Sequence, residues 1–99
     1  MTVLRTGAEV PEGLAPVVMI SLELLMNGNP VALYELAQLA RDPSHRLFGN
    51  TGEVLRSLNL VDAGGKVHDA TRAVVLAATD GDGSDLRLRS PYAEGADRA

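Results

Sequence analysis

The stretch GNTGEVLRSLNLVDAGGKVHD, residues 49–69, decides the fold of this 99-residue chain. Its first half, together with Leu47 just before it, has the spacing of one apolar helical face, made up of Leu47, Thr51, Val54, Leu55 and Leu58. The spacing then changes, and short apolar runs stand on both sides of Gly64-Gly65. Two short runs around a two-residue glycine loop are typical of a β-hairpin. The stretch therefore predicts a helix followed by a small hairpin.

The start of that helix can be placed at either of two positions. Asp42 and Pro43 suit the N-cap and the first helical turn. Asn50 with Glu53 three residues later suits a second cap before Thr51. Gly49 and Gly52 each weaken a helix by ~1 kcal/mol relative to alanine. The balance favours the start at Thr51.

A strongly apolar helix is predicted over residues 13–27, with Pro16 in its first turn and Gly28 just after its end. Apolar side chains cover most of its circumference, so more than one side should be buried. The helix could fill the centre of a bundle or form a subunit interface. The residues expected at a homodimer interface are Val18, Ile20, Leu22, Leu25 and Met26.

Two more helices and a strand are expected around this core. The turn NGNP precedes a helix over residues 31–42, whose apolar stripe is Leu33, Leu36, Ala37 and Ala40, with Tyr34, Glu35, Gln38 and Arg41 outside it. Asp69 can cap a fourth helix, with apolar positions Val74, Val75, Ala77 and Ala78. Alternation of Leu and Arg over residues 85–90 predicts a half-buried strand.

This pattern predicts three segments: a flexible N-terminal arm over residues 1–12, one domain over residues 13–90, and a disordered tail over residues 91–99. The domain should be mainly α with a small β-hairpin, made of four helices and two or three short strands. The chain is long enough for one core.

Composition narrows the functional classes. Without cysteine, disulfides and thiolate metal sites are excluded. The longest apolar run is too short to span a bilayer, and no basic leader precedes it, so a cytoplasmic protein is expected. His45 and His68 fit no metal-binding spacing, and no nucleophile constellation is evident. We therefore expect neither a cofactor nor an enzyme.

The net charge of −4 does not favour nucleic acid for the whole molecule. Residues 41–72 are the exception, because five basic side chains there outnumber four acidic ones. Any contact with an acidic partner should therefore lie in this middle third.

The runs LYELAQLA, residues 33–40, and VLRSLNLVDAGGKVHDATRAVVLA, residues 54–77, carry a family resemblance. They resemble winged helix-turn-helix domains, both the MarR-type transcription regulators and the winged-helix dimerisation domains of some O-methyltransferases. The resemblance covers roughly residues 14–90. It implies a winged-helix fold and a small, dimeric transcription regulator that binds duplex DNA.

The residues expected to contact DNA lie at the start of the recognition helix, in the loop before it and in the wing. Arg reads guanine, Asn reads adenine, and Ser or Thr holds phosphate. The candidates are Ser44, His45, Arg46, Asn50, Thr51, Arg56 and Lys66.

The alternative is a winged-helix-like module that binds another protein and not DNA. The acidic net charge supports it. So do the long linker before Thr51, where the compact motif has a turn of 3–4 residues, and a short wing whose only basic candidates are Lys66 and His68.

Overall fold

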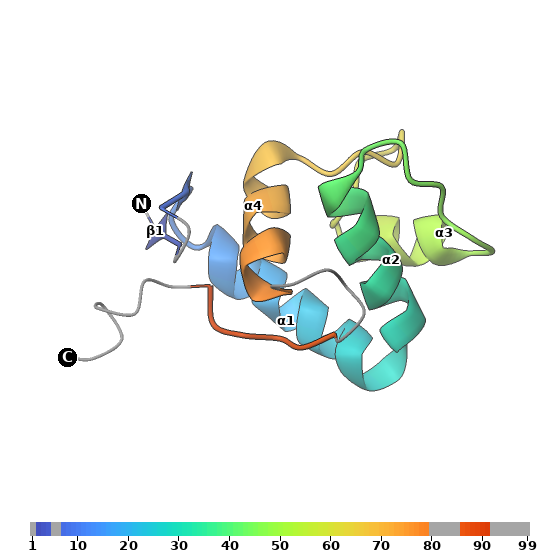
Figure 1. The fold of residues 1–99 in the computed structure, drawn as a ribbon, viewed down its shortest axis with the longest axis horizontal. Coiled ribbons are helices and arrows are strands. Elements are labelled where there is room, and N and C mark those ends of the chain that lie inside the picture. Colours follow the sequence, from blue (N-terminus) through green and yellow to red (C-terminus); the bar gives the residue numbers. More distant parts are fainter. Residues whose placement is uncertain (1, 5–6, 80–85, 92–99) are drawn as a thin grey trace.

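The computed structural model describes residues 2–4, 7–79 and 86–91. Within them the chain forms two short strands and four helices (Figure 1). The elements are β1 (Thr2–Val3), β2 (Glu9–Val10), α1 (Leu14–Gly28), α2 (Pro30–Arg41), α3 (Thr51–Ser57) and α4 (Asp69–Ala78). The expected class is confirmed at this level: the fold is mainly helical with one small antiparallel hairpin.

Helix α1 is buried on one side, although its sequence is apolar on nearly all sides. Its buried face consists of Ala15, Val18, Ser21, Leu22 and Leu25. The opposite face exposes Val17, Ile20 and Leu24. The observed bounds of α1, Leu14–Gly28, are close to the predicted residues 13–27. One side of α1 is buried and the other is exposed.

Asn29 joins α1 to α2. Its backbone N–H donates to Leu25 O at 2.7 Å and closes α1. Its side-chain oxygen accepts from Ala32 N–H at 3.2 Å and caps α2, with Pro30 as the first helical residue. The predicted stripe of α2 is confirmed as buried, and so are the predicted apolar positions of α4.

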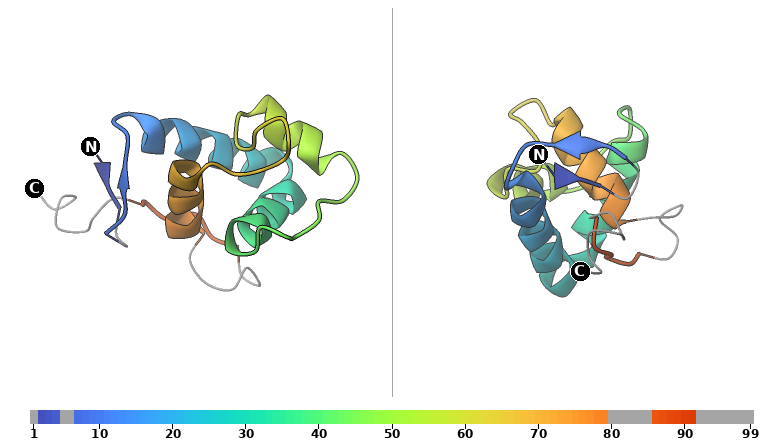
Figure 2. Two further views of the ribbon diagram at one scale, coloured as in Figure 1. Left: turned by 90° about the horizontal axis from the view of Figure 1, so that it is seen from above. Right: turned by 90° about the vertical axis from the view of Figure 1, so that its left-hand side faces the viewer.

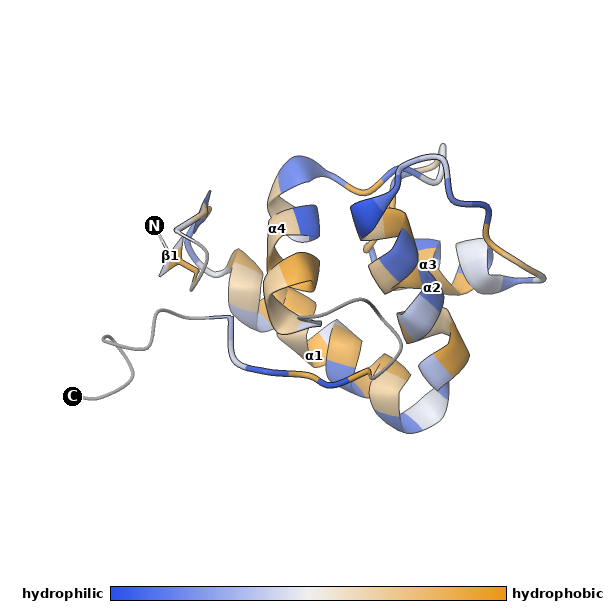
Figure 3. Ribbon diagram, viewed as in Figure 1, coloured by the Kyte–Doolittle hydropathy of each residue, from blue (hydrophilic) through white to orange (hydrophobic). Residues whose placement is uncertain are grey.

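Helices α1, α2 and α4 pack against one another, and α3 packs against α2 (Figures 1 and 2). The apolar side chains of α1 and α4 form much of the core, whereas polar residues dominate the loop that follows α2 (Figure 3).

Two arginines connect α2 and α4, and each binds a carbonyl at the C-terminal end of the other helix. Arg72 of α4 donates through Nε to Ala40 O, in the last turn of α2. Arg41, the last residue of α2, donates to Thr79 O just after α4, at 3.3 Å. Because helix C-termini carry unpaired carbonyls and partial negative charge, each arginine stabilises the end of the other helix.

The prediction of a flexible N-terminal arm is wrong for its described residues. Thr2 pairs with Val10, and Val3 pairs with Glu9, in an antiparallel hairpin. Leu4 and Val10 are buried in the core, and β2 contacts α4. Strands of two residues are too short to show an alternating pattern, so the periodicity argument could not detect them.

The hairpin expected around Gly64-Gly65 is a tight turn without strands. The strand expected over residues 85–90 is absent from residues 86–91, where Arg89 N–H donates to Ala78 O. Pro91, assigned to the tail, is buried. The remainder of the expected disordered tail, residues 92–99, lies outside the described residues.

Candidate nucleic-acid interface

The segments that carry the predicted DNA contacts gather at one end of the molecule. The loop of residues 42–50, α3 and the turn of residues 60–67 lie together there, and the β1–β2 hairpin lies at the opposite end (Figures 1 and 2). The fold therefore brings the most basic third of the sequence to a single end.

A buried glutamate anchors the loop to α2. The Glu35 carboxyl group accepts Phe48 N–H through Oε1 at 3.2 Å and the Thr51 hydroxyl through Oε2 at 3.0 Å. The residue is only 4% exposed, and its bond with the Thr51 hydroxyl is buried, whereas its bond with Phe48 N–H is partly buried. Glu35 thereby fixes the path of the chain into α3, and burial in this setting strengthens each bond.

Sequence reasoning placed Glu35 outside the apolar stripe and missed its role. The carboxyl group bonds to positions 13 and 16 residues further along the chain. No helical pattern relates a residue to a loop at that separation. The nearest signal in the sequence was the apolar residue Leu39, one turn further along α2. It indicates that this side of the helix is covered, and Leu39 is indeed buried.

Two predicted DNA contacts belong to this anchor. Thr51 is 5% exposed, and its hydroxyl donates to Glu35. His45 Nε2 lies 3.5 Å from Glu35 Oε1 and is buried, with no hydrogen-bond partner within the described part of the chain. The Thr51 hydroxyl and this edge of His45 face the interior and cannot meet a ligand from solvent.

The other five predicted contacts, Ser44, Arg46, Asn50, Arg56 and Lys66, are exposed. Ser44 donates from its backbone N–H and its hydroxyl to Asp42 Oδ1, at 3.0 and 2.7 Å. These bonds, the hydroxyl one first, lower the pKa of Asp42. Asp42 is the C-cap of α2, so the alternative of a third helix starting at Pro43 is wrong.

Helix α3 begins at Thr51, as favoured, and turns its buried residues toward α2. Glu53, Arg56 and Ser57 are exposed on its other side. Its C-terminus is a Schellman motif, in which Leu60 N–H donates to Leu55 O and Asn59 N–H to Arg56 O, both at 3.0 Å. Asn59 takes the left-handed position that this motif requires, with φ 59°.

The turn that replaces the predicted hairpin is held by Asp62. Its Oδ1 accepts the N–H groups of Gly64 and Lys66, at 2.8 and 2.9 Å, and its own N–H donates to Lys66 O at 2.9 Å. The bond from Lys66, followed by that from Gly64, lowers the pKa of the Asp62 carboxyl. Gly65 has φ 83°, a conformation that glycine adopts without strain.

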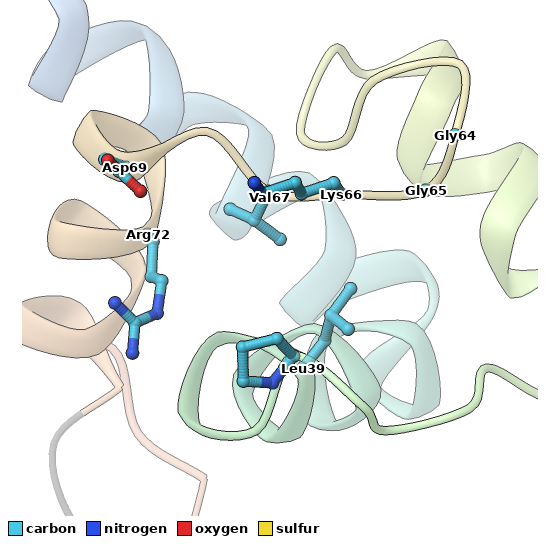
Figure 4. Close-up of a pocket in the computed structure, with 8 residues that line it drawn as sticks. Leu39, Gly64, Gly65, Lys66, Val67, Asp69 and Arg72 are labelled. Atoms are coloured by element: carbon cyan, nitrogen blue, oxygen red, sulfur yellow. The ribbon is translucent and has the colours of Figure 1, made fainter.

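A groove of about 490 Å³ separates this turn from α2 and α4 (Figure 4). Leu39 and Pro43 line it from the end of α2, residues 64–67 from the turn, and Asp69 and Arg72 from α4. Arg72, which the sequence did not single out, thus shares the groove with Lys66.

The predicted dimer-interface residues need correction. Val18, Leu22 and Leu25 are buried in the chain's own core, and Met26 is half-buried against it. Ile20 is 61% exposed. Because the helix is apolar nearly all round, its sequence alone could not tell which side faces inward.

Among the described residues, no helix has the length and apolar character needed to cross a membrane, and no group of three His, Cys, Asp or Glu is placed to hold a metal ion. No protein-family model, curated protein or solved structure matches the chain.

Proposed function

We propose that this chain is a small DNA-binding transcription regulator of the helix-turn-helix type, in which α3 is the helix that approaches the duplex. The observation that supports the proposal best is that three exposed basic residues lie on segments gathered at one end of the molecule (Figures 1 and 2). Arg46 lies on the loop, Arg56 on α3 and Lys66 on the turn. Phosphate contacts from flanking segments position a recognition helix on DNA.

The surface of α3 suits this role in part. Its seven residues give a helix of about 10 Å, enough for two turns in a major groove. Arg56 would contact a base edge or a phosphate, while Glu53 beside it can accept only from cytosine N4 or a similar donor. The anchor made by Glu35 holds α3 against α2, so its orientation is set before a duplex binds.

Titration with a mixed-sequence duplex over a range of salt concentrations tests the proposal. Binding should weaken steeply with salt, and Arg46→Gln with Arg56→Gln should reduce the slope of log K against log salt by about two. The matched control is Arg87→Gln with Arg89→Gln, which removes the same charge from residues 86–91, alongside α1 and α4 (Figure 1). Absence of binding at ~50 mM salt, or equal loss in both variants, would contradict DNA recognition by this end.

A protein-interaction module is the second candidate, and exposed apolar side chains favour it. Phe48 is 74% exposed on the loop, although its backbone N–H is fixed by Glu35. Val31 and Tyr34 are exposed on α2 at 66% and 43%. Aromatic side chains on rigid supports are typical anchors of protein interfaces. Under this candidate Phe48→Ser abolishes capture of a partner, whereas Arg46→Gln has no effect on it.

A further inference from the structure

We propose that the groove between α2, the turn of residues 64–67 and α4 binds the phosphate group of an organic ligand. Lys66 and Arg72 would provide the charged contacts, and Leu39 and Val67 would contact the organic part. The site is separate from the polar face of α3. It can be tested with a small phosphate ester, so it does not depend on the chain binding DNA.

The size and lining of the groove suit an organic anion. Its volume of about 490 Å³ lies within the range of roughly 300–1,000 Å³ typical of ligand sites. Leu39 and Val67 are both 6% exposed and give one wall an apolar surface. Two cationic side chains from different elements line the same space (Figure 4).

Hydrogen bonds anchor the backbone of Lys66 and the guanidinium group of Arg72. The backbone of Lys66 is fixed on both sides, through its N–H and its carbonyl, by Asp62. Arg72 donates Nε to Ala40 O, and this bond uses one of its five N–H donors. The terminal guanidinium nitrogens retain the paired N–H geometry that suits phosphate oxygens.

Neither cation has a carboxylate partner within ion-pair distance in the residues that the structure covers. Asp69 lines the same groove but forms no ion pair with Lys66 or Arg72. The negative charge of its carboxylate repels a phosphate group, so the affinity of the original chain for a phosphate ester should be modest. This repulsion can be tested, because removing the charge of Asp69 should strengthen the binding of a phosphate ester.

Titration of the ¹⁵N-labelled full chain with phenyl phosphate, followed by amide chemical shifts, tests the site. Shifts should cluster at residues 64–72, and benzyl alcohol at the same concentration should not produce them. Lys66→Gln should weaken binding roughly two- to five-fold, and Asp69→Asn should tighten it by a similar factor, as expected for partly exposed charge pairs. Arg87→Gln, at an exposed arginine that does not line the groove, is the matched control and should leave the affinity unchanged.

The opposite signs of the two substitutions separate a binding effect from loss of folding, since a damaged chain would not bind more tightly. No shifts at millimolar phenyl phosphate, equal shifts with benzyl alcohol, or an affinity unaffected by both substitutions would overturn the proposal.

A parallel titration with duplex DNA identifies whether the bound phosphate belongs to DNA or to a small ester. If duplex DNA moves the same amides and Lys66→Gln reduces the salt slope by about one, the groove holds a backbone phosphate of DNA. If phenyl phosphate binds and the duplex does not, the site takes a small phosphate ester, and the proposed function fails while the site stands.

Discussion

At the scale of single residues, Glu35 determines how the loop of residues 42–50 enters α3. A buried carboxyl group that accepts two donors leaves both without a partner when it is removed. Phe48 N–H and the Thr51 hydroxyl are those donors. The energetic effect should therefore fall on the loop and α3, since α1 and α4 take no part in these bonds.

Glu35→Ala should lower the free energy of unfolding by about 1–3 kcal/mol for each donor left unpaired. Glu35→Gln should cost less, because its amide oxygen can still accept one bond. Urea denaturation gives the total, and hydrogen exchange of the Phe48 amide reports the local bond. Glu53→Gln on the exposed side of α3 is the control and should stay within about 0.5 kcal/mol of the original chain. Equal effects at positions 35 and 53 would refute the anchor.

Asp62 makes the turn of residues 60–67 sensitive to acid. Its pKa lies below the ordinary value of 3.8, chiefly because Lys66 N–H donates to the carboxylate. Because this pKa is lower in the folded state, the stabilisation from Asp62 is complete at pH values above its ordinary pKa. The stabilisation is lost as the pH falls through the pKa of the folded state. The turn should therefore loosen below about pH 4.

Amide exchange at Gly64 and Lys66, measured between pH 5 and pH 2, would detect this loosening after correction for intrinsic exchange rates. Asp62→Asn keeps a side-chain oxygen acceptor but does not titrate, so the same amides should show no acid transition. A transition that persists in this variant would assign the effect to another group.

At the scale of elements, α3 is short and depends on how it ends. Its Schellman motif places Asn59 at φ 59°, where side chains with a Cβ are disfavoured and asparagine is among the better tolerated. Leu60, the next residue, is buried and forms the closing bond to Leu55. The chain direction after α3 is thus set by a left-handed residue.

Asn59→Gly should leave the protein equally stable or raise its stability by a few tenths of a kcal/mol, whereas Asn59→Ala should lower it by about 1 kcal/mol. Asn27, within the last turn of α1, is the matched control, and its glycine and alanine variants should have the opposite order of stability. There alanine should be the more stable replacement and glycine the less stable one. Thermal unfolding of the four variants gives both orders, and the same order at both sites would contradict the left-handed assignment.

At the scale of the whole molecule, α1 presents an exposed apolar stripe that no other part of the described residues buries. Val17, Ile20 and Leu24 are 58–61% exposed and follow one another at i, i+3 and i+7. This spacing forms a single seam along a helix, the geometry that packs against another helix. A homodimer of the kind expected from the sequence would therefore have to use this stripe, on the side of α1 away from Val18, Leu22 and Leu25.

Light scattering over a range of concentrations should show self-association that Ile20→Ser with Leu24→Ser abolishes. Because both side chains are already exposed, the double variant should lose little stability. Leu22→Ala, fully buried on the opposite face, should lower the free energy of unfolding by about 2–5 kcal/mol. Val3→Ser on β1 controls for the loss of an exposed apolar side chain elsewhere. A monomer at all concentrations would refute the dimer.

The long periodic segments were the predictable part of this fold. Leu33, Leu36, Ala37 and Ala40 lie on the buried side of α2 because apolar side chains at helical spacing have one favourable place to go. The start of α3 at Thr51 was also predicted correctly, although the Asn50 side chain forms no capping hydrogen bond there, so the cap expected from Asn50 and Glu53 is not the reason.

The parts that could not be predicted depend on contacts between distant residues. Asp62 closes the Gly64-Gly65 turn by side-chain bonds, so no strand pairing is required there. Thr51 looks like a phosphate ligand in the sequence, and only its contact with Glu35 reveals a structural role. Arg72 reaches the groove because α4 packs beside α2, which no local pattern of charges could indicate.

The exchange of arginines between α2 and α4 has a consequence for protein engineering. A transplant of residues 30–58 alone into a new scaffold would leave Arg72 behind, and the carbonyl of Ala40 would have to find another donor. Arg41 would in turn lose the carbonyl of Thr79. The smallest portable unit that keeps both bonds therefore extends from α2 through Thr79, and shorter grafts would need a substitute cation at each helix end.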